Sequence, residues 1–198
     1  IFDLGGVLVD WKPEYVYRKV FKDDEEKVQW FLKNICTPEW NMEQDAGRTI
    51  AEANAIKIAE FPEFEDLIKL FYEKWPQMFS GPIQENIELF KNLKKTGQYK
   101  MYALTNWSAE KWDIALELFP FFNEFDGTVV SGLVKTRKPF PEIYKILLNK
   151  FNIEPENAIF IDDNNDNILA AKALKINGIH FKNHKQLLKK LKYFNINF

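Results

Sequence analysis

The chain has 198 residues, of which 46% are hydrophobic and 28% are charged, a balance typical of a soluble globular protein with a substantial core. Its formal net charge of −2 gives no electrostatic reason to expect nucleic acid or an anionic membrane as a partner. No apolar run approaches the roughly 18 residues of a membrane-spanning helix. The single cysteine, Cys36, excludes an internal disulfide and fits a reducing compartment, so we expect a cytoplasmic protein.

The first residues predict the end of a buried strand. Residues 1–4 form an apolar run around Asp3, and two glycines that favour a turn follow directly. Residues 7–11 predict a short extended hairpin, and Pro13 is typical of the first turn of a helix.

Between residues 13 and 80 the apolar positions recur at the spacing of helices, and no strand candidate interrupts them. The apolar stripes fall within 15–20, 28–35, 50–57 and 67–75. Residues 38–48 are the most polar part and contain a glycine, so we expect a loop there. The whole stretch predicts a small helical bundle.

Beyond residue 80 helices and short buried strands alternate. The expected helices are 83–96, 109–119, 141–151, 166–176 and 185–193, and the expected strands are 99–104, 127–130, 158–161 and 178–181. Such alternation implies right-handed crossovers and a parallel sheet with helices on both faces. We therefore predict an α/β protein with a Rossmann-like core of residues 1–12 and 81–198 and an inserted helical-bundle cap of residues 13–80.

Polar side chains follow the strands of this predicted sheet, at the carboxyl ends where open parallel sheets bind ligands. They are Asp3, Thr105, Lys138, and the adjacent pair Asp162 and Asp163. Each alone is an ordinary turn residue, helix cap or surface charge. Their coincidence at one edge of one sheet favours a functional site.

The residue types at this edge suit phosphoryl transfer. Clustered carboxylates repel one another unless a cation lies among them, and oxygen ligands beside a phosphate suit Mg²⁺. A carboxylate that attacks phosphorus forms an aspartyl-phosphate, which water can hydrolyse. Thr105, Lys138 and backbone amides would donate to the charged group in transfer.

The same positions fall in four ordered motifs that resemble those of the haloacid dehalogenase-like hydrolase superfamily. The motifs are IFDLGGVLVD at 1–10, LTNWS at 104–108, RKPFPEIY at 137–144 and FIDDNNDN at 160–167. The helical stretch lies where that family places its small cap. The chain is most similar to bacterial sugar-phosphate phosphatases of the glucose-1-phosphate type. The resemblance implies a Mg²⁺-dependent hydrolase of small phosphate monoesters, with no nucleic-acid or membrane partner, and it predicts no oligomeric state.

Carried over position by position, the resemblance makes Asp3 the nucleophile. Thr105 and Lys138 would complete the catalytic set and bind the phosphoryl group, with Asn106 beside them. In the cap, Arg48 or Trp40 would contact the substrate, unless Trp40 packs inside the bundle and Arg48 lies on the surface.

For the metal, the resemblance implies ligands from Asp3, Asp163 and Asp162 and from the backbone carbonyl of Gly5. Asn167 would orient the lysine or a metal-bound water.

Gly5 is also a departure from the family pattern, because most family phosphatases carry an acid/base aspartate at that position. Three alternatives follow. A phosphatase would take protons from the substrate, from solvent or from another group such as Asp10; a 2-haloacid dehalogenase would need no acid; and a protein that has lost catalysis would bind phosphorylated ligands or regulate a partner.

Overall fold

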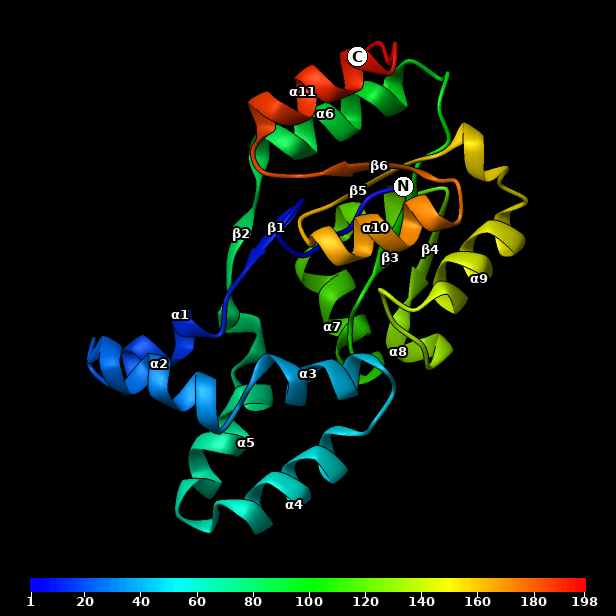
Figure 1. Ribbon diagram of the computed structural model, residues 1–198. Coiled ribbons are helices and arrows are strands. Elements are labelled where there is room, and N and C mark those ends of the chain that lie inside the picture. The colour runs from blue at the N-terminus through cyan, green and yellow to red at the C-terminus, as the bar shows by residue number, and fades with distance from the viewer.

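A computed structural model describes residues 1–198, and Figure 1 shows a sheet flanked by helices, with further helices gathered at one end. Strand β3 (Tyr102–Thr105) pairs in parallel with β4 (Gly127–Val130), and β5 (Ile159–Asp162) pairs in parallel with β6 (Asn177–His180). Phe2 forms parallel bridges to one residue of β3 and one of β5. Residues 1–3 therefore lie between the two pairs and join them into one parallel sheet.

Helices cover both faces of this sheet because alternate strand residues point to opposite sides. On one face, Phe2, Ala103 and Ile161 share a core with α6 (Gln84–Lys95) and α11 (His184–Tyr193). On the other, Leu104 and Phe160 pack against α9 (Pro141–Phe151) and α10 (Asn165–Ala173). Helices α7 (Ala109–Leu118) and α8 (Ser131–Val134) follow β3 and β4. The predicted α/β class with a Rossmann-like parallel sheet is confirmed.

The remaining helices gather beyond the carboxyl ends of β3 and β4 (Figure 1). They are α1 (Glu14–Val20), α2 (Glu25–Asn34), α3 (Pro38–Asp45), α4 (Ile50–Glu60) and α5 (Glu65–Glu73), and we refer to them together as the cap. Their shared core is aromatic: the ring of Tyr17 lies 4.8 Å from that of Phe31 and 6.4 Å from that of Phe71. Short 3-10 turns occupy Pro62–Phe64, Trp75–Met78, Pro120–Glu124 and Pro155–Asn157. None of the helices has the length and apolar character required to cross a bilayer.

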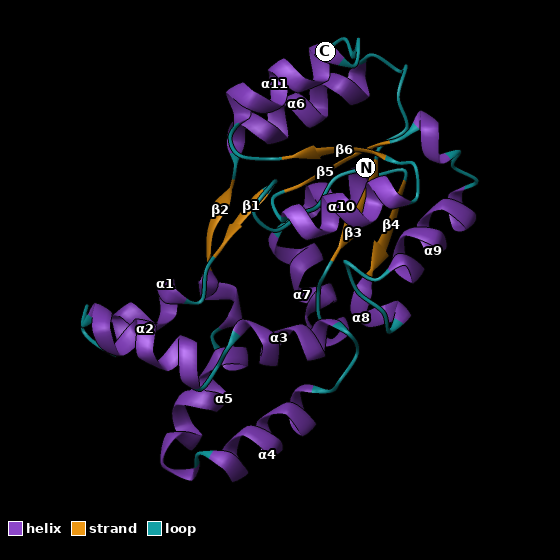
Figure 2. Ribbon diagram, in the orientation of Figure 1, coloured by secondary structure: helices purple, strands orange, loops and turns teal.

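The two connections between sheet and cap pair with each other. Strand β1 (Val9–Trp11) runs antiparallel to β2 (Phe79–Pro82), and Figure 2 shows the two strands side by side. The prediction of a hairpin within residues 7–11 was wrong, because the partner strand comes from the far end of the inserted helices. A pairing across so long a separation leaves no local turn signal in the sequence.

Residues 38–45 form a helix, so the predicted loop over 38–48 was wrong in its first part. The hydroxyl of Thr37 accepts a hydrogen bond from the backbone amide of Trp40, and Pro38 occupies the first turn. Gly47 follows at a φ of +103°, a conformation that favours glycine, and it ends this segment. Helix α3 contacts α8 of the core, so it lies on the side of the cap that faces the sheet.

Candidate active site

Lys138 is the centre of a buried charge cluster at the carboxyl edge of the sheet. Its Nζ lies 2.8 Å from a carboxylate oxygen of Asp3 and 2.7 Å from one of Asp162. Lys138 is 1% exposed and Asp162 is completely buried. Charges this deep require partners, because an unpaired buried ion costs several kcal/mol, about 3–5 when one partner is removed.

Burial and charge oppose each other in this cluster. Burial alone would lower the pKa of Lys138, but the carboxylates of Asp162 and Asp3 outweigh it and raise that pKa above its ordinary value. Burial raises the pKa of Asp3 well above its ordinary value, against the opposing charge of Lys138. The lysine is therefore a fixed cation, and Asp3 depends on positive charge to remain ionised.

Asparagine side chains hold this cluster in place. Asn167 donates to both carboxylate oxygens of Asp162, at 3.0 and 3.1 Å, and its backbone carbonyl accepts from the hydroxyl of Tyr144. The structure thus brings Asn167 to Asp162, which itself pairs with Lys138, and the predicted role of Asn167 in orienting the lysine or a water stays a prediction. Asn106 accepts from the backbone amide of Lys138 at 2.8 Å and donates to its carbonyl at 3.0 Å. These bonds position that loop, and Asn106 also lines the cavity beside Asp3 and Lys138, so its predicted phosphate contact stays a prediction.

Three carboxylates converge beside the lysine. Asp3, Asp162 and Asp163 each offer an oxygen atom, and these atoms lie within 4.8 Å of one another. Asp163 is the exposed member, yet desolvation within the cluster and the charge of Asp162 raise its pKa. Since one lysine cannot neutralise three carboxylates, the donor set fits a divalent cation bound by oxygen atoms, as Mg²⁺ is.

The turn after Asp3 is shaped around this cluster. Gly6 adopts a φ of +70°, and a Cβ atom there would overlap the carboxylate of Asp163. By contrast, a Cβ at Gly5 would meet nothing within 4 Å. Position 5 therefore has room for a side chain, and glycine leaves that space open.

Thr105 ends β3, the strand beside residues 1–3. It is 1% exposed, and its hydroxyl has no hydrogen-bond partner. A buried hydroxyl without a partner is uncommon and needs an explanation. A phosphoryl oxygen at this edge would accept a hydrogen bond from it.

A cavity of about 340 Å³ lies between the core and the cap. Asp3, Lys138 and Asp163 line it from the core, and Asn41 and Asp45 line it from α3. A smaller recess of about 80 Å³ is lined by Gly5 and, again, by Asn41 and Asp45, and its other walls are largely aromatic: Trp11, Tyr72, Trp75, Phe79 and Trp107. We call these spaces the reaction cavity and the aromatic recess.

Two predicted groups of the cap do not line these spaces, and in the core Thr105 and Asp162 do not line them either. The guanidinium of Arg48 donates to the side chain of Gln44 at 2.8 Å and to the carbonyl of Trp40 at 3.0 Å, and Arg48 lines neither space. Trp40 is 6% exposed and packs against Phe71, so it belongs to the bundle core. The geometry does not support a substrate contact by Arg48 or Trp40.

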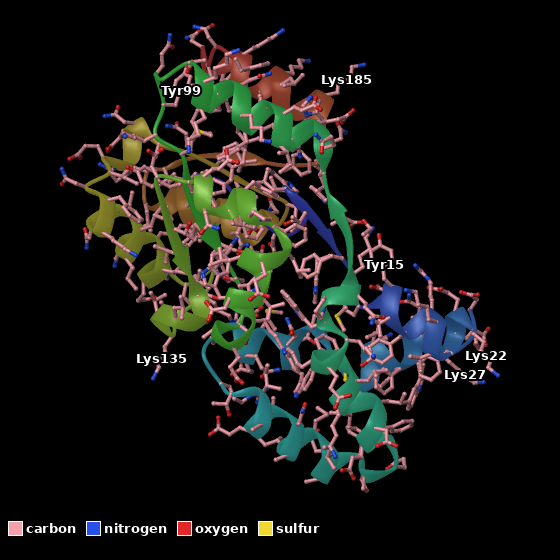
Figure 3. All side chains as sticks on the ribbon, turned by 180° about the vertical axis from the view of Figure 1, so that it is seen from behind. Tyr15, Lys22, Lys27, Tyr99, Lys135 and Lys185 are labelled. Carbon is pink, nitrogen blue, oxygen red and sulfur yellow. The ribbon has the colours of Figure 1, made fainter.

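Asp10, a suggested replacement acid, is also engaged elsewhere. Its carboxylate accepts from the hydroxyls of Ser80 and Tyr15 and pairs with Lys12, and these contacts outweigh partial burial and lower its pKa. Tyr15 lies where the cap meets the β1–β2 ribbon (Figure 3). Asp45, by contrast, lines both spaces, and it was missed because Arg48 or Trp40 was expected to be the residue of this segment that contacts the substrate.

Comparison with known proteins identifies the family of the chain. The chain matches the family model of haloacid dehalogenase-like hydrolases over residues 1–181, a span that contains all four motifs. A phosphorylated carbohydrates phosphatase of Thermotoga maritima is 27% identical over 184 residues, which cover 91% of this chain and 82% of that protein. A sesquiterpene phosphatase of Aspergillus oryzae is 26% identical over 185 residues, which cover 91% and 87%.

A solved structure provides the same comparison in three dimensions. It is a HAD-family enzyme of Bacteroides thetaiotaomicron in complex with magnesium and inorganic phosphate. Its TM-score is 0.65 at 26% identity, over 91% of this chain and 92% of that one. With the motifs, the fold and the charge cluster in agreement, the chain belongs to the haloacid dehalogenase-like hydrolases.

Proposed function

We propose that the chain is a Mg²⁺-dependent phosphatase that hydrolyses a small phosphate monoester through an aspartyl-phosphate on Asp3. The observation that carries this proposal is the ion pair between Asp3 and the buried Lys138 at the floor of a cavity of about 340 Å³. Lys138 favours the ionised form of Asp3 against the effect of burial, and this carboxyl lines a space large enough for a phosphate ester. The three-carboxylate cluster and the unpartnered hydroxyl of Thr105 support it.

In the first step a carboxylate oxygen of Asp3 attacks phosphorus, and the bond from phosphorus to the leaving oxygen breaks. Thr105 donates to a phosphoryl oxygen, and Lys138 neutralises charge on the nucleophile and the phosphate. Water then attacks the aspartyl-phosphate, which releases inorganic phosphate and restores Asp3. Mg²⁺, held by Asp3, Asp162, Asp163 and the carbonyl of Gly5, would supply neutralisation of the phosphoryl oxygens.

The substrates of relatives guide the choice of test compounds. The named relatives act on phosphorylated carbohydrates and a sesquiterpene phosphate. The aromatic recess offers ring faces against which a sugar ring or a terpenoid would pack. We therefore place sugar phosphates first and prenyl-type phosphates second among the candidate substrates.

The test is release of inorganic phosphate from a panel of sugar phosphates, nucleotides, terpenoid phosphates and an aryl phosphate, with Mg²⁺ and with chelator. We expect turnover that requires Mg²⁺ and that Asp3→Asn abolishes while the variant stays folded. Acid quenching during turnover of a ³²P-labelled substrate should trap label on the parent but not on Asp3→Asn. Absence of Mg²⁺-dependent turnover across the panel would reject the proposal.

One observation favours a second candidate, a binding protein without turnover, and that observation is the absent side chain at Gly5. Such a protein would bind inorganic phosphate and Mg²⁺ in calorimetry yet hydrolyse no ester. The same panel with 2-haloacids added tests the dehalogenase alternative. Three clustered carboxylates disfavour it, because they repel an anionic haloacid.

A further inference from the structure

The cap contains a carboxyl that could replace the acid that position 5 lacks. A side chain at Gly5 would project into open space, and Gly5 lines the aromatic recess. Asp45, at the end of α3, lines that same recess and also the reaction cavity that contains Asp3 and Lys138. The carboxyl of Asp45 therefore borders both the space beside Gly5 and the space where the ester would react.

The surroundings of Asp45 leave its carboxyl available for proton transfer. It accepts a hydrogen bond from the side chain of Asn41 at 3.3 Å, and the nearby backbone of Ser108 acts to lower its pKa. Unlike Asp162, it forms no ion pair with a lysine or arginine within 4.0 Å. A carboxyl that lines a cavity and accepts one hydrogen bond from a neutral donor keeps acceptor capacity for a ligand.

The charged and titratable groups around Asp45 come from three elements. Lys138 and Arg137 of the loop after α8 act on it from the core, Tyr72 of α5 acts from the cap, and Arg48 lies on its own segment. Burial raises the pKa of Asp45 to about 7, against the charges of Arg137 and Lys138, which pull it down. A group that changes protonation near neutral pH serves as both acid and base.

From this placement, the geometry points to Asp45 as the general acid and base of the reaction, supplied by the cap in place of the side chain that Gly5 lacks. The inference rests on the proposed phosphatase function. In the first step Asp45 gives its proton to the leaving oxygen as the bond to phosphorus breaks and the bond to Asp3 forms. In the second, the Asp45 carboxylate takes a proton from the attacking water, so that Asp3 is released and Asp45 returns to its protonated form.

The test compares two leaving groups in Asp45→Asn. An alkyl phosphate, whose alkoxide needs a proton, should lose about 10²–10⁴-fold in kcat/KM. p-Nitrophenyl phosphate, whose phenolate leaves unprotonated, should lose less than about tenfold in the same parameter, which reports transfer to Asp3. The control is Glu43→Gln, which removes the same charge from an exposed position of the same helix and should change neither.

A rescue and a titration separate catalysis from structure. Gly5→Asp has room in the open space and should restore alkyl phosphate turnover at least about tenfold in the Asp45→Asn background. In ¹³C-carboxyl NMR, the signal lost in Asp45→Asn and kept in Glu43→Gln should titrate near pH 7 in the Mg²⁺-loaded parent.

The outcomes distinguish this inference from the function on which it rests. Equal losses for both esters, no loss for the alkyl ester, or an Asp45 signal that titrates near pH 4 would overturn the role of Asp45 while leaving the phosphatase proposal intact. A parent that hydrolyses none of the esters would overturn both.

Discussion

The ammonium group of Lys138 lies 2.8 Å from the carboxylate of Asp3, and the two side chains are 1% and 11% exposed. Each member of a pair this deeply buried depends on the other, because either charge alone would be strongly disfavoured. Asp162 shares the same ammonium group. The stability of this edge of the sheet and the charge state of Asp3 therefore depend on the same ammonium group.

Lys138→Met should therefore lower both the stability and the activity of the protein. Loss of the ammonium group leaves two buried carboxylates without their cation, so we expect a loss of about 3–5 kcal/mol in the free energy of unfolding. Loss of a fixed donor to the phosphoryl group should also lower kcat by about 10²–10³-fold. Urea unfolding and turnover at saturating substrate measure the two effects. Lys145→Met, at an exposed position of α9, is the control, and a Lys138 variant as stable and active as that control would contradict the assignment.

Gly6→Ala should damage the metal site through the backbone. Gly6 and Gly97 both adopt left-handed conformations, with φ of +70° and +66°, so alanine at either should cost about 1–2 kcal/mol of stability. Only at Gly6 would the new methyl group overlap the carboxylate of Asp163. We therefore expect the Mg²⁺ concentration for half-maximal turnover to rise in Gly6→Ala and to stay unchanged in Gly97→Ala. Equal Mg²⁺ requirements in both variants would show that Asp163 does not bind the metal.

The sheet and the strand-end residues could be predicted because the sequence marks them locally. Apolar runs of strand length alternate with helical stripes; Asp3, Thr105 and Asp162 each lie at the end of such a run, and Lys138 lies in the loop that follows β4 and the short helix α8. Once the strands are parallel, their carboxyl ends must meet at one edge. The clustering of these side chains follows from topology, without knowledge of any single contact.

The cap side of the site could not be predicted in the same way. Helix α3 buries Gln44 one turn after Trp40, and the amide of Gln44 bonds to the carbonyl of Trp40 and to the hydroxyl of Tyr72. A buried polar residue at this position interrupts the apolar stripe, so the sequence reads as a loop. The place of Asp45 also depends on how the cap docks on the core, which no local pattern encodes.

The hydrogen-bond partners of the two site asparagines could not be predicted from the sequence either. Asn106 and Asn167 lie in motifs whose positions were clear, but their partners depend on side-chain directions. The structure turns the first toward the backbone of Lys138 and the second toward Asp162. Both are positioning residues in this geometry.

Thr37→Ala should link the start of α3 to activity. The hydroxyls of Thr37 and Thr49 both accept from a backbone amide in the first turn of a helix, each at 3.2 Å, so loss of either should cost about 0.5–2 kcal/mol. Only α3 carries Asp45, and Thr37 also lines the reaction cavity. Thermal unfolding should show similar losses for Thr37→Ala and Thr49→Ala, whereas kcat/KM should fall only in the former. Parallel changes in kcat/KM would mean that cap stability in general, and not α3, governs the site.

The stability of the protein should depend on pH through Asp45. Its pKa rises from the ordinary 3.8 to about 7 on folding, so the folded state keeps a proton that the unfolded chain has already lost. The contribution of this carboxyl to the free energy of unfolding must therefore fall as pH rises from about 4 to about 7. Asp45→Asn cannot titrate, so we expect the variant to gain stability relative to the parent between pH 5 and pH 8 in urea unfolding. Other carboxyls of the site titrate in both proteins and largely cancel in this difference. Glu43→Gln should show no such trend. Only a shifted pKa in the folded state makes the difference between Asp45→Asn and the parent depend on pH. A constant difference across that range would therefore place the pKa of Asp45 near its ordinary value.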